Sequence, residues 1–254
     1  MKRIRVFFNK TRYVLVFLLV GLVSFSFFSI LRKTGRIEEI FIGKGAFTWT
    51  KGKRLYVTNH PSWIDQFIVI ALRVPFWSTN FLPFVLVADD NVKRLSFLSF
   101  LRKTAFIVPI VRNGNKFAAK SQIREMEALL DDNQSLMMAG SPGRDFKGSP
   151  EEKIYSSIEG KPLRKFTNLC GRFAVIPGVE TIPLCIKGTD KLYYEIEVNG
   201  EKDMKFSWSK FFIDFILIGK IKVKIIYAEP LHLGGNHKEA AQKVQTTVLS
   251  FLDY

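Results

Sequence analysis

Short apolar runs alternate with longer stretches of helical periodicity along most of this 254-residue chain. Apolar runs of this length, bounded by turn residues, are typical of buried strands. Between them, apolar residues recur three and four positions apart, which predicts amphipathic helices. The alternation predicts one α/β domain. The expected strands cover residues 54–58, 84–88, 105–111, 135–139, 181–186 and 222–227, and the expected helices cover residues 63–72, 116–130 and 237–252.

The pattern changes near the N-terminus, where residues 13–31 form an apolar stretch without a charged side chain. A helix of that length, rising about 1.5 Å per residue, just reaches across the roughly 30 Å hydrocarbon core of a bilayer. Arg32 and Lys33 follow it, where a cleaved signal peptide would have small residues. We therefore predict a retained membrane-anchor helix within residues 1–36 and a folded domain over residues 37–254. The pattern leaves open whether the helix spans the bilayer or lies in one leaflet.

The net charge of +15, from 38 Lys and Arg against 23 Asp and Glu, suits nucleic acid or an anionic membrane surface. Residues 1–54 hold 12 of the basic residues against Glu38 and Glu39, and so account for +10 of the total. Because this charge surrounds the apolar stretch and no nucleic-acid-binding motif accompanies it, we expect membrane lipids as partners and no nucleic acid. The expected location is a membrane, the inner membrane in a bacterium, with the folded domain on the cytoplasmic face. The oligomeric state stays open.

Two cysteines and three histidines limit the other chemistry of the chain. Two cysteines cannot build a disulfide framework, and the histidines lack partners at ligand spacing, so we expect no metal site. Cys170 and Cys185 are expected to fill space in the core.

A histidine and an aspartate flank the start of a predicted helix, in the sequence Asn59-His60-Pro61-Ser62-Trp63-Ile64-Asp65. The strand at residues 54–58 ends here, and a turn plus one helical rotation can bring the carboxylate of Asp65 beside the imidazole of His60. A carboxylate on one ring nitrogen fixes the tautomer, so that the other nitrogen can take a proton from a hydroxyl. The spacing therefore indicates a general-base pair, with a histidine in a turn and a solvated aspartate as the alternative.

The run from Asn59 to Asp65 resembles the NHxxxxD signature of the glycerolipid acyltransferases, which acylate glycerol-3-phosphate, lysophosphatidate and related lysolipids. The resemblance extends over about residues 50–230. Residues 106–112 match the family's second block, GxxFIxR, only in part, because Lys103 replaces the glycine and Arg112 comes three places late. Residues 181–184 match the fourth block, an apolar strand with a central proline.

The third block of the family, usually EGTR, is here Ser141-Pro142-Gly143-Arg144, which is similar to the Ser-Gly-Gly-Arg-Asp form of the plastid glycerol-3-phosphate acyltransferases. A turn with glycine and proline exposes backbone N–H groups, and Arg144 adds a planar cation with paired donors, which together suit a phosphate. We expect Ser141, Gly143 and Arg144 to bind the phosphate of the acceptor, with a weaker contribution from Arg112.

The resemblance implies a single αβ acyltransferase domain, a mixed sheet flanked by helices, with His60 and Asp65 at one end of a tunnel for the acyl chain. It implies transfer of a fatty acyl group from acyl-CoA or acyl carrier protein to a hydroxyl of a glycerophosphate or lysophospholipid in phospholipid synthesis, without a metal or redox cofactor. Because Ser141 replaces the usual glutamate, two alternatives stay open: a non-phosphate lysolipid or amino-acid lipid as acceptor, and an inactive lipid-binding member of the family.

Residues 206–218 form an aromatic-rich run, FSWSKFFIDFILI, that fits either the core or a membrane interface. We favour the core, because exposed apolar patches are uncommon unless they serve a surface.

Overall fold

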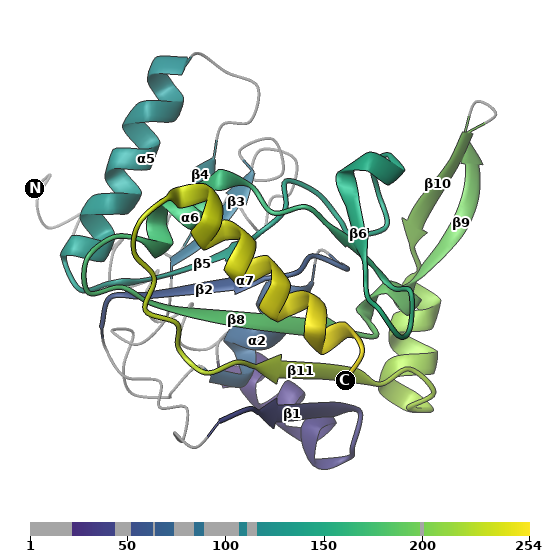
Figure 1. Cartoon of the computed structure of the whole chain (residues 1–254). Coiled ribbons are helices and arrows are strands. Elements are labelled where there is room, and N and C mark those ends of the chain that lie inside the picture. Colours follow the sequence, from purple (N-terminus) through teal and green to yellow (C-terminus); the bar gives the residue numbers. More distant parts are fainter. Residues whose placement is uncertain are drawn as a thin grey trace, which may run out of the picture.

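A computed structural model describes residues 22–43, 52–62, 64–73, 84–88, 107–110, 116–198 and 201–254. These residues form a seven-stranded sheet in the order β1-β11-β8-β2-β5-β3-β4, with helices on both faces (Figure 1). All neighbouring strands are parallel except β11 and β8, which run antiparallel. The predicted α/β fold with a mixed sheet flanked by helices is therefore confirmed. The strands of this sheet are β1 (Ile37–Phe41), β2 (Arg54–Thr58), β3 (Phe84–Ala88), β4 (Ile107–Ile110), β5 (Ser135–Ala139), β8 (Glu180–Lys187) and β11 (Val223–Tyr227).

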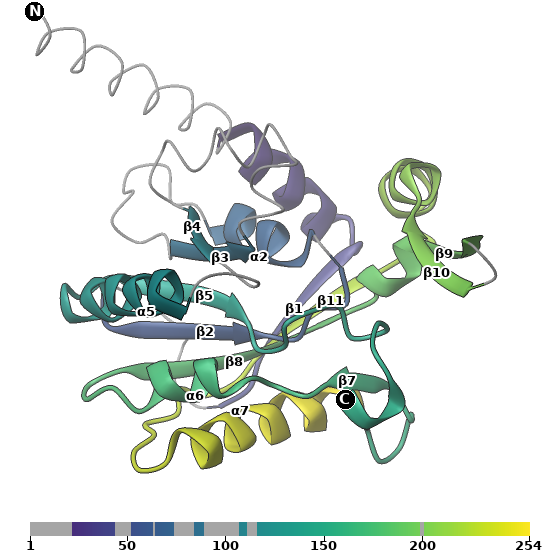
Figure 2. The ribbon, with the colours of Figure 1, turned by 90° about the horizontal axis from the view of Figure 1, so that it is seen from above.

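The helices form layers on the two faces of the sheet (Figure 2). α6 and α7 cover one face, and α2 and the helical residues 22–33 lie on the other. The predicted helices correspond to α2 (Asp65–Arg73), α5 (Lys116–Asp131) and α7 (His237–Leu252), whereas α6 (Asn168–Ala174) and β1 were not predicted.

The central strand β2 shows why the sheet needs both layers. Tyr56 belongs to the apolar cluster beneath α2, and Leu55 and Val57 belong to the cluster beneath α6 and α7. All three side chains are at most 1% exposed. A strand covered on both faces is typical of a parallel sheet, and its run of β-formers was readable from the sequence.

Smaller elements extend from the carboxyl end of the central strands. β9 (Tyr193–Val198) and β10 (Glu201–Phe206) form a hairpin that projects from the body, and β6 (Lys153–Tyr155) pairs with β7 (Pro162–Arg164). A π-helix, Lys210–Leu217, follows β10. Neither hairpin was predicted, because β6 and β7 have three residues each, and β9 and β10 alternate apolar with charged residues instead of forming an apolar run.

The core prediction for residues 206–218 holds for one face of that segment only. Phe215 is fully buried, but Trp208, Phe212, Leu217 and Ile218 are each more than half exposed. Cys170 and Cys185 are buried in the core as predicted, and burial raises the pKa of the Cys170 thiol to about 12.

The predicted anchor lies partly outside the described residues, which begin at residue 22. Residues 22–33 are helical and pack into the core through Leu31. Over the part of the chain that the structure describes, no helix is both long and apolar enough to cross a membrane.

Candidate active site

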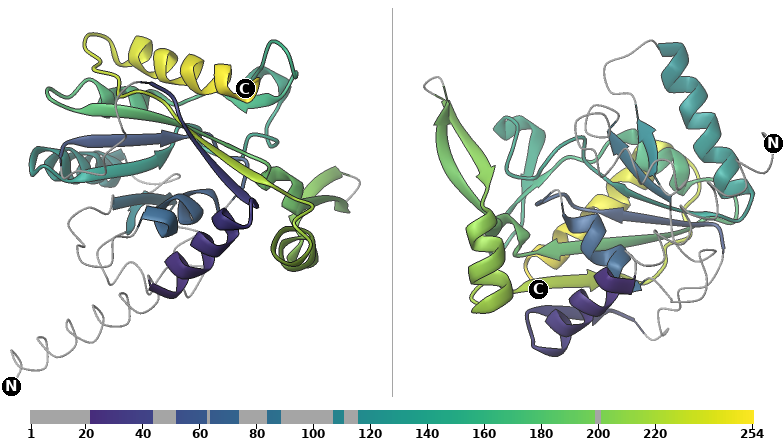
Figure 3. Two further views of the ribbon diagram at one scale, coloured as in Figure 1. Left: turned by 90° about the horizontal axis from the view of Figure 1, so that it is seen from below. Right: turned by 180° about the vertical axis from the view of Figure 1, so that it is seen from behind.

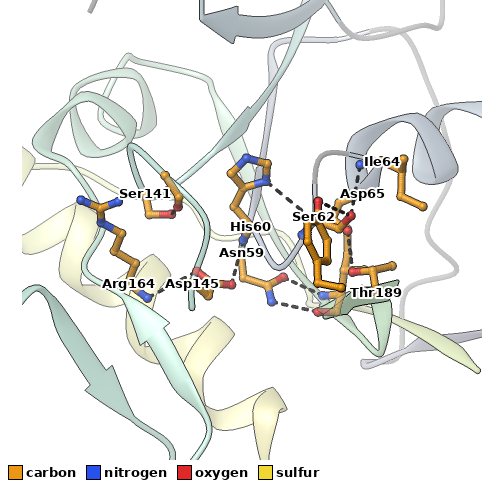
Figure 4. Close-up of polar contacts among 12 residues, drawn as sticks. Asn59, His60, Ser62, Ile64, Asp65, Ser141, Asp145, Arg164 and Thr189 are labelled. Carbon is orange, nitrogen blue, oxygen red and sulfur yellow. Dashed lines mark hydrogen bonds and ion pairs between the residues drawn. The ribbon is translucent and has the colours of Figure 1, made fainter. Parts of the chain in front are cut away.

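The site begins where β2 ends in the middle of the sheet. The Asn59 amide makes two hydrogen bonds to the backbone of Ile186 in the neighbouring strand β8: its Nδ2 donates to the carbonyl at 2.9 Å, and its Oδ1 accepts from the N–H at 2.7 Å. Asn59 is 1% exposed, so these bonds are shielded from water. The side chain thus fixes the direction in which the chain leaves the sheet, and with it the position of His60 (Figure 4).

His60 and Asp65 lie side by side, as their spacing predicted. The Nδ1 atom of His60 is 3.6 Å from Oδ2 of Asp65, across the turn that leads into α2. This distance is longer than a hydrogen bond, as is common for catalytic pairs without substrate. The Nδ1 atom is buried, whereas the side chain as a whole is 22% exposed. The opposite edge of the ring, which carries Nε2, faces away from Asp65 (Figure 4).

The Asp65 carboxylate is held by two further donors. Its Oδ1 accepts from the Thr189 hydroxyl at 2.6 Å, and its Oδ2 accepts from the Ser62 N–H at 2.5 Å. Asp65 is completely buried, and this burial raises its pKa, while His60 and the two donors act in the opposite direction. Thr189 follows β8 on a short 3-10 helix, and sequence spacing alone could not place it here.

Asp145 connects His60 to the predicted phosphate turn. Its Oδ2 accepts from the His60 N–H at 2.9 Å, its own N–H donates to the His60 carbonyl at 3.0 Å, and its Oδ1 accepts from the Arg164 N–H at 3.3 Å. Burial raises the pKa of Asp145 to about 7. No catalytic or binding role was predicted for Asp145, although the plastid form of the third block also ends in aspartate.

The turn itself brings Ser141, Gly143 and Arg144 to the same end of the sheet. The buried Ser141 hydroxyl donates to the Gly143 carbonyl at 2.7 Å, so it shapes the turn rather than pointing to solvent. The half-buried Arg144 guanidinium lies 5.1 Å from the ring centre of Tyr193 and 5.9 Å from that of Phe146. Aromatic faces attract this cation without occupying its N–H donors, which stay able to meet an anion.

A second cation beside the turn was missed by sequence reasoning. Arg164, on β7, approaches Gly143 so closely that a Cβ on that glycine would meet its guanidinium. Its Nη2 donates to the Glu152 carboxylate at 2.8 Å. No motif marked Arg164 in the sequence. Arg112, the remaining predicted contact, lies outside the described residues.

A basic cleft of about 800 Å³ opens beside these residues, with Asn59, Pro61 and Asp145 in its wall. Among its cations, Lys187 is 13% exposed and donates to the Leu252 carbonyl at 2.7 Å. Burial, together with Lys161, lowers the pKa of Lys187. The cleft suits an anionic group. Its other cations are Arg32, Lys161, Lys191, Lys222 and Lys224, against the acids Glu38, Glu159 and Asp190.

The described residues contain no group of three His, Cys, Asp or Glu side chains that could hold a metal ion. The site residues that the structure does bring together are those of a proton-transfer pair, His60 and Asp65, next to a turn with an arginine.

Comparison with known proteins gives a structural match. No protein-family model and no curated protein matches the sequence. A solved structure does match: the crystal structure of the 1-acyl-sn-glycerophosphate (LPA) acyltransferase PlsC from Thermotoga maritima, with a TM-score of 0.54 over 100% of this chain and 97% of that chain, at 16% sequence identity. The chain has the fold of an LPA acyltransferase. This match supports the α/β fold that the sequence resemblance implies, a mixed sheet flanked by helices.

Proposed function

We propose that this protein is an acyltransferase of lipid synthesis that moves a fatty acyl group from a thioester donor to a hydroxyl of a glycerophosphate or lysophospholipid. The observation that carries the proposal is the His60–Asp65 pair: a buried, doubly hydrogen-bonded carboxylate lies behind Nδ1, and Nε2 lies on the opposite edge of the ring. The shared fold with an LPA acyltransferase supports the same reaction class.

In the proposed mechanism, the acceptor hydroxyl binds at Nε2 of His60. As its oxygen attacks the thioester carbonyl, His60 takes the hydroxyl proton, and Asp65 stabilises the imidazolium that forms. The tetrahedral intermediate then expels the thiolate, which takes the proton back from His60, so that an ester and a free thiol result. No metal or redox cofactor is needed, because the step moves only a proton and an acyl group. Orientation of the two reactants can supply up to about 7–11 kcal/mol of the barrier reduction.

Arg144 is proposed to bind the acceptor phosphate. Its guanidinium lies over Tyr193, whose hydroxyl is 3.3 Å from Ser62 Oγ. The Ser62 N–H in turn donates to Asp65, the partner of His60. The Gly143 N–H and the neighbouring Arg164 extend this positively charged turn, and Arg112 keeps its predicted supporting role. A guanidinium can meet two phosphate oxygens at once.

The basic cleft supports an anionic acyl donor. Acyl-CoA carries phosphate groups, and a donor bound along the cleft could present its thioester at the wall formed by Asn59 and Pro61. Acyl carrier protein is the second donor that the family resemblance implies. We further propose that the basic, apolar N-terminal region holds the protein on the cytoplasmic face of a membrane.

A turnover assay tests this function. Full-length protein in detergent is incubated with acyl-CoA or acyl carrier protein donors and a panel of acceptors: glycerol-3-phosphate, lysophosphatidate, a neutral lysolipid and an amino-acid lipid. We expect one phosphorylated acceptor to be acylated, and His60→Ala to lower the rate by about 100- to 10,000-fold. His232→Ala, at an exposed histidine, is the matched control and should retain wild-type activity.

Three results would contradict parts of the proposal. Acylation of no acceptor would indicate an inactive lipid-binding protein. Preference for a neutral lysolipid or amino-acid lipid would show that the acceptor is not recognised by a phosphate. Full activity of His60→Ala would refute the general-base mechanism.

A further inference from the structure

The segment that follows the β9–β10 hairpin exposes an unusual amount of apolar surface. Five large side chains of residues 208–218 are between 47% and 69% exposed, and they share one helical segment. Contiguous exposed apolar patches on soluble proteins usually mark a binding surface. We call these five residues the apolar face; they are Trp208, Phe212, Ile213, Leu217 and Ile218.

The π-helical geometry explains why these residues share one side. In a π-helix each N–H bonds to the carbonyl five residues earlier, as the Ile218 N–H does to the Ile213 carbonyl at 2.8 Å. Residues four or five apart therefore lie above one another. The opposite side packs into the core through the fully buried Phe215 and the partly buried Phe211. The segment is thus apolar on both sides: one side packs into the core, and the other exposes large apolar side chains that only a partner or a lipid surface could cover.

The π-helix that carries the apolar face lies on the same side of the sheet as residues 22–33, the described end of the predicted anchor (Figures 2 and 3). Helical residues 22–33 and the π-helix both lie on the side away from α7 (Figures 2 and 3). They are joined where the Arg36 guanidinium donates to the Leu217 carbonyl at 2.8 Å. The helix at residues 22–33 also exposes apolar side chains, with Val23 at 62% and Ile30 at 59%.

We propose that the apolar face binds the interface of an anionic bilayer, as a second membrane contact beside the N-terminal anchor segment. The described end of the predicted anchor, helical residues 22–33, lies on this side of the protein (Figures 2 and 3), and basic side chains lie at the edges of the apolar face. Lys205 and Lys220, at the two ends of the segment, and Lys33, after the N-terminal helix, are all exposed. Cations at the edge of an apolar face attract anionic headgroups.

An aromatic series connects the apolar face to the candidate active site. Trp208 packs against Phe206 with ring centres 5.1 Å apart, and Phe206 packs against Tyr193 at 5.4 Å. Tyr193 is the ring beneath Arg144. On the proposed function, membrane binding by this face holds Arg144 close to the headgroup layer. The favoured acceptor is then a lysolipid taken from the bilayer rather than a soluble glycerol phosphate.

A lipid-quenching experiment tests the membrane contact without relying on activity. Full-length Ile213→Cys, labelled with an environment-sensitive fluorophore, is reconstituted into vesicles of phosphatidylcholine and phosphatidylglycerol with brominated acyl chains. Ile158→Cys is the matched control, because Ile158 is 81% exposed on the β6–β7 connection. Cys170 and Cys185 are buried and should stay unlabelled in the native protein.

We expect the label at position 213 to shift to the blue and to be quenched by the brominated lipid several-fold more than the label at position 158. Equal quenching at both positions would refute the proposal. A blue shift that increases with protein concentration in detergent and does not respond to brominated lipid would refute it in favour of a second copy of the chain.

A kinetic comparison then tests the link to the acceptor. Ile213→Glu/Leu217→Glu should lower turnover of a vesicle-borne lysolipid by about tenfold, because apolar contact with the bilayer is lost. Turnover of a soluble short-chain acceptor should be unchanged. Equal losses on both acceptors would refute the link. Quenching without any turnover would refute the proposed function but leave the membrane contact in place.

Discussion

His60 and Arg144 lie at the same end of the sheet, but the protein holds them by different means. The partner of His60 is a completely buried carboxylate that accepts hydrogen bonds from Thr189 and Ser62. Arg144 is half-buried and rests on the faces of Tyr193 and Phe146. A general base must meet the proton it takes in one orientation, so a rigid hydrogen-bond network suits the role proposed for His60. A cation that binds a mobile substrate needs donors that stay available, and an aromatic platform leaves them so.

Asp145 connects the part of the site around His60 with the turn that carries Arg144. Its carboxylate accepts from the His60 N–H and its own N–H donates to the His60 carbonyl, while the adjacent residue, Arg144, supplies the positive charge. The comparison predicts that changes near His60 alter the chemical step and that changes at Arg144 alter acceptor binding. It also predicts that Asp145 makes the stability of the protein depend on pH.

The largest effect is expected from Asp65→Asn. The amide carries no charge that could stabilise an imidazolium, and one of the two oxygens that accept from Thr189 and Ser62 becomes an NH2 donor. We expect kcat to fall by at least about 100-fold, measured under saturating acceptor. Asp131→Asn, at an exposed aspartate paired with Lys53, is the matched control. A folded Asp65→Asn protein with wild-type kcat would show that the rigid network around His60 does not support the chemical step.

Arg144→Ala should affect binding more than chemistry. Hydrogen bonds to charged groups contribute about 1.5–3 kcal/mol, so we expect KM for a phosphorylated acceptor to rise by about 10- to 100-fold. KM for a neutral acceptor should change little. Arg172→Ala, which removes an arginine paired with Glu127, serves as the control. Equal increases in KM for both acceptors would show that Arg144 does not bind the acceptor phosphate.

Thermodynamic linkage makes Asp145 a probe of pH-dependent stability. Burial raises the pKa of Asp145 in the folded protein from its ordinary value of 3.8 to about 7, so the native state binds this proton more tightly than the unfolded state. Between these values the native state loses stability as pH rises, by up to about 1.4 kcal/mol per pH unit. Asn does not titrate.

The free energy of unfolding, measured in urea from pH 4 to 7, should therefore fall more steeply for the wild type than for Asp145→Asn. Parallel profiles for the two proteins would show that burial does not hold the Asp145 proton. Asp65, which is buried too, titrates in both proteins, and its charge contributes to the raised pKa of Asp145, so the difference between the profiles includes this coupling.

The smallest change is expected for Thr189→Val, because it removes one donor and leaves the Asp65 charge in place. We expect kcat to fall by about 5- to 20-fold with little change in KM, since a lost hydrogen bond to a buried charged group costs about 1–2 kcal/mol in positioning. Thr189→Ser should restore the rate. A change confined to KM would show that Thr189 does not act through Asp65.

Local patterns were enough for much of the fold. Residues 54–58 and 135–139 are continuous apolar runs that end at turn residues, and residues 237–252 repeat apolar positions at helical spacing. In each case the signal lies within one element, where side-chain period and backbone period must agree. The β6–β7 hairpin and α6 have too few residues for the spacing of their apolar positions to indicate a strand or a helix.

The sequence by itself determined that His60 and Asp65 can meet, because only one turn of chain separates them. Only the tertiary structure decided what surrounds them. Thr189 and Ile186 come from a strand and turn more than 120 residues away, and no local spacing encodes that pairing. The same holds for residues 206–218, whose composition fits both the core and a membrane interface. Which side of that segment is covered depends on what the rest of the chain packs against it, and the core has room for one face only.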